Sequence, residues 1–75
     1  MTAKDLGRLS EAEAKFRTAL KADPNNEKAL YALAWTLVAE KKRPEAKTTF
    51  ESFLKIAKDP IMKQNATAAL GRLGK

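Results

Sequence analysis

The chain contains no cysteine and no histidine among its 75 residues. Without cysteine it can form neither a disulfide nor a thiolate metal site. Without either residue, the common pairs of catalytic base and nucleophile are missing as well. The serines and threonines that remain fit positions at helix caps or on helix surfaces. We therefore expect a protein that is not an enzyme and that holds no metal or cofactor.

Long apolar runs are also absent from the sequence. No stretch approaches the roughly 18 apolar residues of a membrane span, and the first residues lack the apolar centre of a signal peptide. A soluble cytoplasmic protein is the default expectation. The few glycines and prolines, three of each, mark no flexible linker, and no strand-like alternation is visible. We expect one small domain over residues 1–75, which at this size buries only about 60% of its unfolded surface.

Apolar residues recur three and four positions apart along most of the chain, the spacing that gathers side chains on one face of a helix. The central example is Leu30, Leu33, Ala34 and Leu37. This periodicity predicts an all-α fold of antiparallel helix-turn-helix units. The four expected helices cover about residues 10–22, 27–41, 44–58 and 60–73.

Local signals predict where these helices begin and end. Gly7 is expected to end a preceding helix, and Ser10-Glu11-Ala12-Glu13 fits a capping box that would start a new one. Pro24 cannot continue that helix, so we expect it to end near residue 22. Asp59-Pro60 combines an N-cap acceptor with a proline in the first turn, which is a strong start signal.

The sequence also matches itself at a fixed offset, which indicates an internal repeat. A shift of 34 residues aligns five positions within one helix: Glu11 with Glu45, Ala12 with Ala46, Phe16 with Phe50, Leu20 with Leu54 and Lys21 with Lys55. A shift of 37 aligns the flanking helices, for example Ala29 with Ala66 and Leu33 with Leu70. The chain is therefore expected to contain one complete helical pair between two half units.

These features resemble the tetratricopeptide repeat, whose 34-residue pattern is W-x2-L-G-x2-Y, then A-x3-F, then a proline. The matching residues are Leu30-x2-Leu33-Ala34-x2-Leu37, Ala46-x3-Phe50 and Pro60 in the centre, Ala12-x3-Phe16 with Asp23-Pro24-Asn25-Asn26 before it, and Leu70-Gly71 after it. The resemblance implies an α-solenoid that acts as a protein–protein interaction module. It also implies a capping final helix and an N-terminus that is cut short or completed by another chain.

In that family, the first helices of successive repeats line a concave groove that takes a peptide or a helix. Carried onto this sequence, the resemblance implies a binding groove formed by Lys28, Tyr31, Trp35, Val38, Asn65 and Arg72, with Ala68 between the last two. The aromatic pair beside Lys28 and Arg72 could hold an apolar side chain and a carboxylate. The alternative is that Tyr31 and Trp35 pack as core against the neighbouring helix.

Self-association is a further expectation. The helix over residues 10–22 lacks its repeat partner, so a second copy could cover its open face and give a symmetric homodimer. The residues expected to form this contact are Leu6, Leu9, Phe16 and Leu20. The alternatives are that the exposed area is tolerated or that a longer parent protein covers it. A further alternative for the function is a structural oligomerisation element that binds nothing in the groove, in which Trp35 would be buried.

The net charge of +6 comes from 15 Lys and Arg against 9 Asp and Glu. Its simplest interpretation is a solvated helical surface, because the charges are scattered at helix-surface spacing. The alternative function is a basic helical domain that binds nucleic acid or an anionic surface, although no nucleic-acid motif is visible and nucleic acid is not the expected partner. Its contact set would be Lys41, Lys42, Arg43, Lys55, Lys58 and Lys63.

Overall fold

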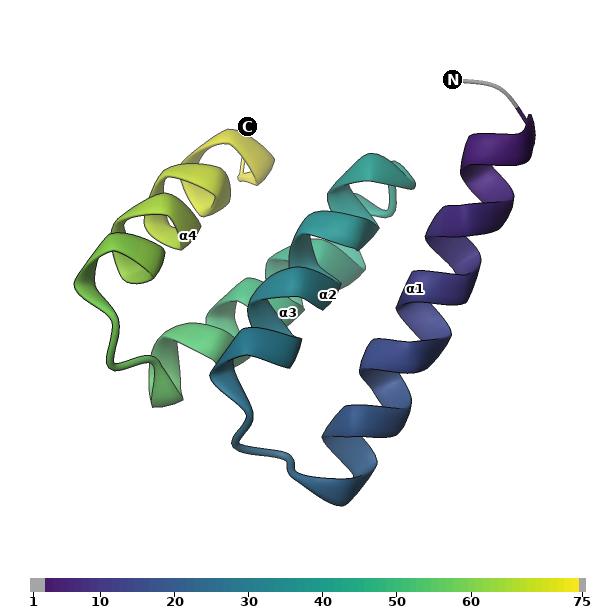
Figure 1. Ribbon diagram of the computed structural model, residues 1–75. Helices are drawn as coiled ribbons and strands as arrows, with labels where there is room; N and C mark the ends of the chain where they lie inside the picture. Colours follow the sequence, from purple (N-terminus) through teal and green to yellow (C-terminus); the bar gives the residue numbers. More distant parts are fainter. Residues whose placement is uncertain (1–2, 75) are drawn as a thin grey trace.

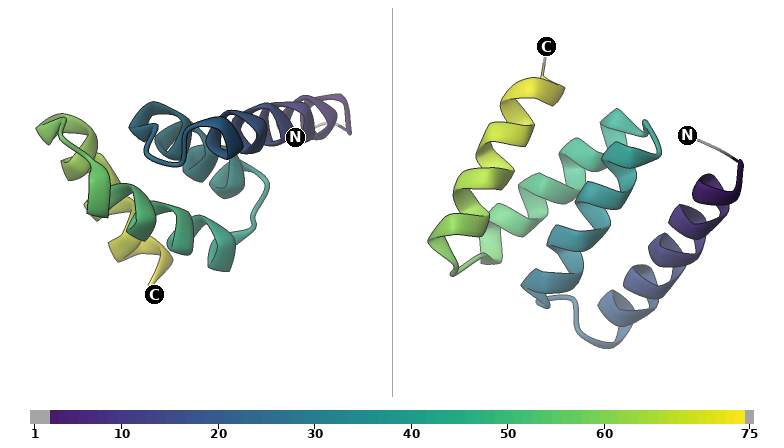
Figure 2. Two further views of the ribbon diagram at one scale, coloured as in Figure 1. Left: turned by 90° about the horizontal axis from the view of Figure 1, so that it is seen from below. Right: turned by 45° about the horizontal axis from the view of Figure 1, so that its top comes forward.

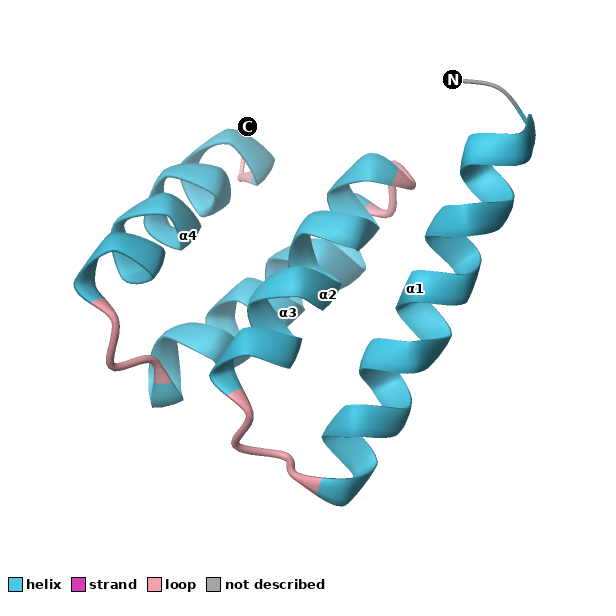
Figure 3. Cartoon of the chain, in the orientation of Figure 1, coloured by secondary structure: helices cyan, strands magenta, loops and turns pink. Residues whose placement is uncertain are grey.

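The structure is a computed structural model that describes residues 3–74, with the side chains of residues 7–74. Its four helices are α1 (Ala3–Ala22), α2 (Glu27–Ala39), α3 (Arg43–Ile56) and α4 (Pro60–Leu73). Each helix packs against the one before it, so that the helices form a row with α1 and α4 at its two ends (Figures 1 and 2). The described residues form helices and short turns and contain no strand (Figure 3).

The main difference from the sequence prediction lies at the start of α1. The helix was expected to begin near Ser10, but it runs without interruption from Ala3. Gly7 does not adopt a positive φ angle, and glycine inside a helix costs only about 1 kcal/mol, which does not by itself break the helix. The capping box is wrong as well, because Glu13 lies in the helix interior and pairs with Arg17 and Lys42.

The turns that begin α2 and α4 follow their predicted chemistry. The side chain of Asn26 accepts a hydrogen bond from the Ala29 backbone N–H at 3.1 Å. Asp59 accepts from the N–H groups of Ile61 and Met62 at 2.9 and 3.2 Å, with Pro60 in the first turn. These caps satisfy backbone donors that a helix leaves unpaired at its start. The start of both helices is therefore encoded locally.

The turn between α2 and α3 ends α2 two residues earlier than expected, at Ala39. Lys41 takes a left-handed conformation with φ 64°, which ends a helix but costs a residue other than glycine about 1 kcal/mol or more. At the other end of α3, the helix stops at Ile56, and the predicted limit was residue 58. Three residues then connect α3 to α4.

The buried core consists of two clusters, and both include residues of α2 and α3. One cluster joins α2, α3 and α4 around the fully buried Phe50 and Phe53 and includes Ala34, Ala57, Ala66 and Ala69. The other joins α2 and α3 through Leu33, Leu37 and Ala46, and is covered by Phe16 and Leu20 of α1. Alanines at the crossings let the helices approach closely, while the two phenylalanines fill the space between them. This packing fixes the position of α2 relative to α4.

Candidate functional site

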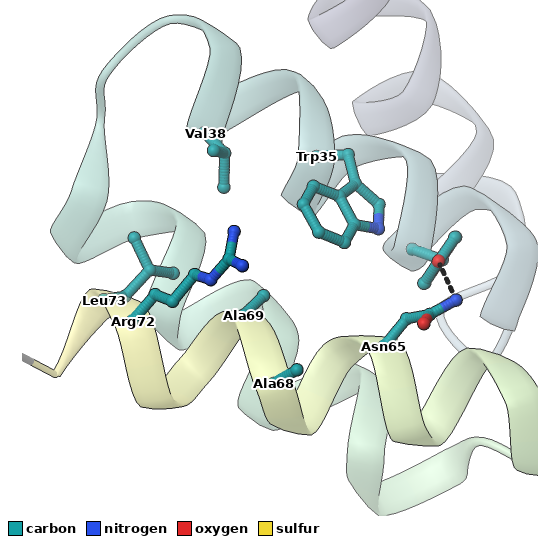
Figure 4. Close-up of a pocket in the computed structure, with 8 residues that line it drawn as sticks. Trp35, Val38, Asn65, Ala68, Ala69, Arg72 and Leu73 are labelled. Atoms are coloured by element: carbon teal, nitrogen blue, oxygen red, sulfur yellow. Dashed lines mark hydrogen bonds between the residues drawn. The ribbon is translucent and has the colours of Figure 1, made fainter.

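A groove of about 450 Å³ lies between α2 and α4. We call it the α2–α4 groove. Three of its side chains come from α2 and five from α4, and Figure 4 shows them converging on the same space. The lining residues are Tyr31, Trp35, Val38, Asn65, Ala68, Ala69, Arg72 and Leu73.

Helical spacing explains why these residues face one another. Tyr31, Trp35 and Val38 follow at intervals of four and three residues, so they form one line along α2. On α4, the intervals between Asn65, Ala69 and Leu73 are four residues each. Because α2 and α4 run in the same direction (Figure 1), the two lines lie along opposite walls of the groove.

The two aromatic residues of the groove rest on the buried phenylalanines of α3. The Trp35 ring meets the Phe50 ring edge to face, with centroids 5.2 Å apart and an 82° angle between planes. Tyr31 lies 5.3 Å from Phe53 and 6.0 Å from Trp35. Trp35 nevertheless remains 39% exposed. The sequence left open whether Tyr31 and Trp35 line the groove or pack as core. In the structure each ring does both.

The ends of the groove carry its polar groups. At one end, Asn65 Nδ2 donates a hydrogen bond of 3.2 Å to the Tyr31 hydroxyl, which joins α4 to α2. At the other end, the Arg72 guanidinium points across the groove toward α2, between Val38 and Trp35 (Figure 4). Among the described residues, no carboxylate forms an ion pair with Arg72. The site is thus apolar in the middle and has polar groups at both ends.

Five of the six residues predicted for the groove line it, the exception being Lys28. Lys28 is exposed in the first turn of α2. The lining also includes Ala69 and Leu73 of α4. Their spacing of four residues from Asn65 onward was the available signal. That these residues bind a partner stays a prediction.

A separate cluster of charges holds α1 against the turn between α2 and α3. Glu13 Oε2 accepts from Arg17 Nε at 2.8 Å, and Glu13 Oε1 accepts from Lys42 Nζ at 3.2 Å. Lys42 Nζ also lies 3.5 Å from Glu40 Oε2, and Arg17 Nη2 lies 3.3 Å from Glu45 Oε2. The cluster therefore alternates negative and positive charges across three elements.

The two central carboxyl groups of this cluster have opposite pKa shifts. The Arg17 hydrogen bond, aided by Glu40 and Lys42, lowers the pKa of Glu13 to about 2. Burial, followed by the neighbouring Glu13, raises the pKa of Glu40. In the described chain, Glu40 Oε1 is buried without a hydrogen-bond partner. When Glu40 is protonated, its carboxyl group can donate to Glu13, which contributes to the opposite shifts of the two pKa values.

The opposite shifts predict opposite effects of neutralising each carboxylate. Folding favours the protonated form of Glu40. The contribution of Glu40 to folding stability is therefore present at low pH and is lost as the pH rises through the pKa of Glu40 in the folded state. Glu40→Gln should therefore raise the melting temperature at pH 7 and have little effect at pH 3. Folding favours ionised Glu13, so its contribution is present at neutral pH and is lost as pH falls from about 4.5 toward 2.

Glu13→Gln should accordingly destabilise the chain at pH 7 by about 1 kcal/mol, because solvent screens much of the interaction. The difference from the parent chain should disappear near pH 2. Thermal unfolding followed by circular dichroism from pH 2 to 8 measures both variants. Melting temperatures that move in the same direction at pH 7 would contradict the opposite pKa shifts of Glu13 and Glu40.

A family model described as tetratricopeptide repeat matches residues 3–73. The chain belongs to this family. Comparisons with curated proteins and with solved structures gave no significant match. The four helices have the all-α, helical-repeat architecture of the tetratricopeptide repeat, a module generally involved in protein–protein interaction.

The structure shows how far the residues that were predicted to self-associate are buried within the tetratricopeptide repeat chain. Phe16 and Leu20 are half-buried, because they pack on the α2–α3 cluster, and Leu9 is half-buried as well. The side chain of Leu6 lies outside the described residues. The apolar face of α1 is thus partly used within the chain, which the sequence prediction did not anticipate because it placed this face opposite a missing helix.

The basic residues of the alternative function do not form one patch in this repeat. The Lys41–Arg43 segment lies at the start of α3 and Lys58 follows its end, and fourteen helical residues span about 21 Å. Lys42 is also engaged with Glu13 and Glu40. Among the helices described, none combines the length and apolar character that a membrane crossing requires.

Proposed function

We propose that this tetratricopeptide repeat chain binds a protein partner by taking a peptide segment of it into the α2–α4 groove. The exposed indole of Trp35, seated on the buried Phe50, is the observation that carries this proposal. A rigid aromatic residue loses little conformational entropy on binding and offers a large apolar contact, which is why tryptophan is common among residues that dominate interface energetics.

The composition of the groove supports the same function. Its volume of about 450 Å³ falls in the range of pockets that bind small ligands, which is also enough for a few side chains of a peptide. Apolar side chains occupy its middle, and a few polar groups at its ends can fix the orientation of a bound segment. No step of bond making or breaking is proposed, and the interaction itself is the function.

A peptide library tests this proposal directly. The probe is an immobilised set of nine-residue random peptides, acetylated and amidated at their ends, exposed to the labelled chain. Peptides that bind, and that lack tryptophan, are then titrated in solution while the fluorescence of Trp35, the single tryptophan, is recorded. Binding in the groove should shift this emission.

Trp35→Ala should weaken binding of the selected peptides by tenfold or more, since hot-spot residues contribute about 2 kcal/mol or more. Ile61→Ala is the matched control, because Ile61 is the other exposed large apolar residue of the described chain and is 69% exposed outside the groove. Circular dichroism checks that both variants remain folded. Equal binding by the two variants would contradict the proposal.

Self-association through α1 is a separate proposal, and it concerns the half-exposed Leu9, Phe16 and Leu20. α1 is at one end of the helical row and its main contact within the chain is α2, so one side of the helix is available to a second copy. Sedimentation equilibrium over a concentration series should show a species of twice the chain mass. A single monomeric species up to high micromolar concentration would rule out this dimer, without affecting the groove.

A further inference from the structure

The α2–α4 groove has a polarity pattern that constrains what it can hold. Asn65 and Arg72 mark its two ends on α4 and are seven residues apart, which corresponds to about 10.5 Å along a helix. The Tyr31 hydroxyl is level with Asn65, because the two groups are hydrogen-bonded. Trp35 lies one helical turn further along α2. An occupant therefore meets a polar end, an apolar middle and a cationic end in that order.

The charge of the groove favours an acidic occupant. Among the described residues that line it, Arg72 is the single charged side chain, and there is no acidic one. Its guanidinium extends over the groove beside Trp35 (Figure 4), where a carboxylate could accept two hydrogen bonds from it. The excess of six positive charges on the whole chain adds attraction for an acidic partner.

We propose that the groove binds an extended peptide segment in which a large apolar side chain and an acidic side chain lie two residues apart. The apolar side chain packs on Trp35 and the carboxylate pairs with Arg72. This inference rests on the proposed function and adds to it the chemistry of the partner. The acidic group is the side chain of Asp or Glu within the segment.

Two features support this spacing and this conformation. Trp35 lies four residues beyond Tyr31 and Arg72 lies seven beyond Asn65, so the two differ in level by three residues, or about 4.5 Å along the parallel helices. Side chains on one side of an extended strand recur about every 6.6 Å, and the long Arg72 side chain can span the remaining distance of about 2 Å. The Asn65 carbonyl oxygen and the Tyr31 hydroxyl can bond a peptide backbone whose N–H and C=O groups are free. An extended segment offers such groups, whereas a helix has already paired them internally.

Designed peptides test the inference. The parent probe is acetylated and amidated, has nine residues and carries Leu-Ser-Glu in a Ser/Gly background. Comparison peptides replace Glu with Gln, replace Leu with Ala, or separate Leu and Glu by five residues. Titration with Trp35 fluorescence as readout should show that each change weakens binding about fivefold or more, and that added salt weakens the parent peptide most.

Charge reversal in the protein gives the sharper test. Arg72→Gln should remove the preference for Glu over Gln, and Arg72→Glu should prefer a peptide with Leu-Ser-Lys. Arg43→Gln, which removes an exposed arginine outside the groove, is the matched control and should keep the parent preference. Circular dichroism establishes that the three variants are folded.

The outcomes separate this inference from the proposed function. If random-library peptides bind through Trp35 but the Glu and Gln probes bind equally, the inference is wrong and the groove function stands. The same conclusion follows if binding requires a free C-terminal carboxylate or a helical peptide with Leu and Glu four residues apart. If neither the designed peptides nor the library binds, both the proposed function and the inference fail.

Discussion

Replacing Phe50 with alanine is expected to cost about 3–5 kcal/mol of the free energy of unfolding. Phe50 is fully buried and belongs to the cluster that joins α2, α3 and α4. The loss combines the transfer energy of the ring with the cavity that remains. A chain of this size is expected to have a total stability of only about 4–11 kcal/mol, so the variant should lose much or all of its cooperative folding.

Urea unfolding followed by circular dichroism measures this effect. Phe16→Ala is the control, because it removes the same ring at a half-buried position on α1 and should cost clearly less. The emission of Trp35 provides a second readout, since its indole packs against Phe50 and should become more exposed to solvent. Similar stability losses in the two variants would show that Phe50 is not the centre of the core.

Replacing Ala66 with leucine is the second large expected effect, with a cost of about 1–3 kcal/mol. Ala66 is fully buried where α4 packs on α3. The crossing has no room for three additional carbon atoms, so α4 should move away from α3. Because α4 forms one wall of the α2–α4 groove, this displacement should also weaken peptide binding.

Ala68→Leu provides a matched comparison on the same helix. Ala68 is exposed and lines the groove, so its enlargement should fill the site and change stability by no more than about 0.5 kcal/mol. Urea unfolding and the library peptides measure the two properties for both variants. The arrangement of α4 would be wrong if Ala68→Leu were strongly destabilising, or if it left peptide binding unchanged.

Much of the fold could be predicted from the sequence because its signals are local. Asn26 and Asp59 cap α2 and α4 in the structure, and the spacing of apolar residues indicates the buried faces. The start of α1 could not be predicted in the same way. Gly7 and Ser10 provide signals for a break, but a helix continues through them where nothing forces it to end. Such a choice depends on a balance of about 1 kcal/mol.

The site was less accessible to sequence reasoning. The resemblance to the tetratricopeptide repeat supplied Tyr31, Trp35 and Arg72, whereas composition and periodicity alone did not separate groove residues from core residues. The double role of Trp35 depends on where α3 places Phe50, which is a tertiary property. The Glu13–Glu40 pair could not be found either, because it joins α1 to a distant turn.

The location of the bound peptide decides whether the α2–α4 groove is the binding site. We would record ¹H–¹⁵N NMR spectra of the chain during titration with a library-selected peptide. If the peptide lies in the α2–α4 groove, the largest shift changes should occur at residues 31–38 of α2 and 65–73 of α4, together with the indole N–H of Trp35. Changes concentrated instead around Arg17, Thr48 and Thr49, which line a hollow formed by α1 and α3, would contradict binding in the groove.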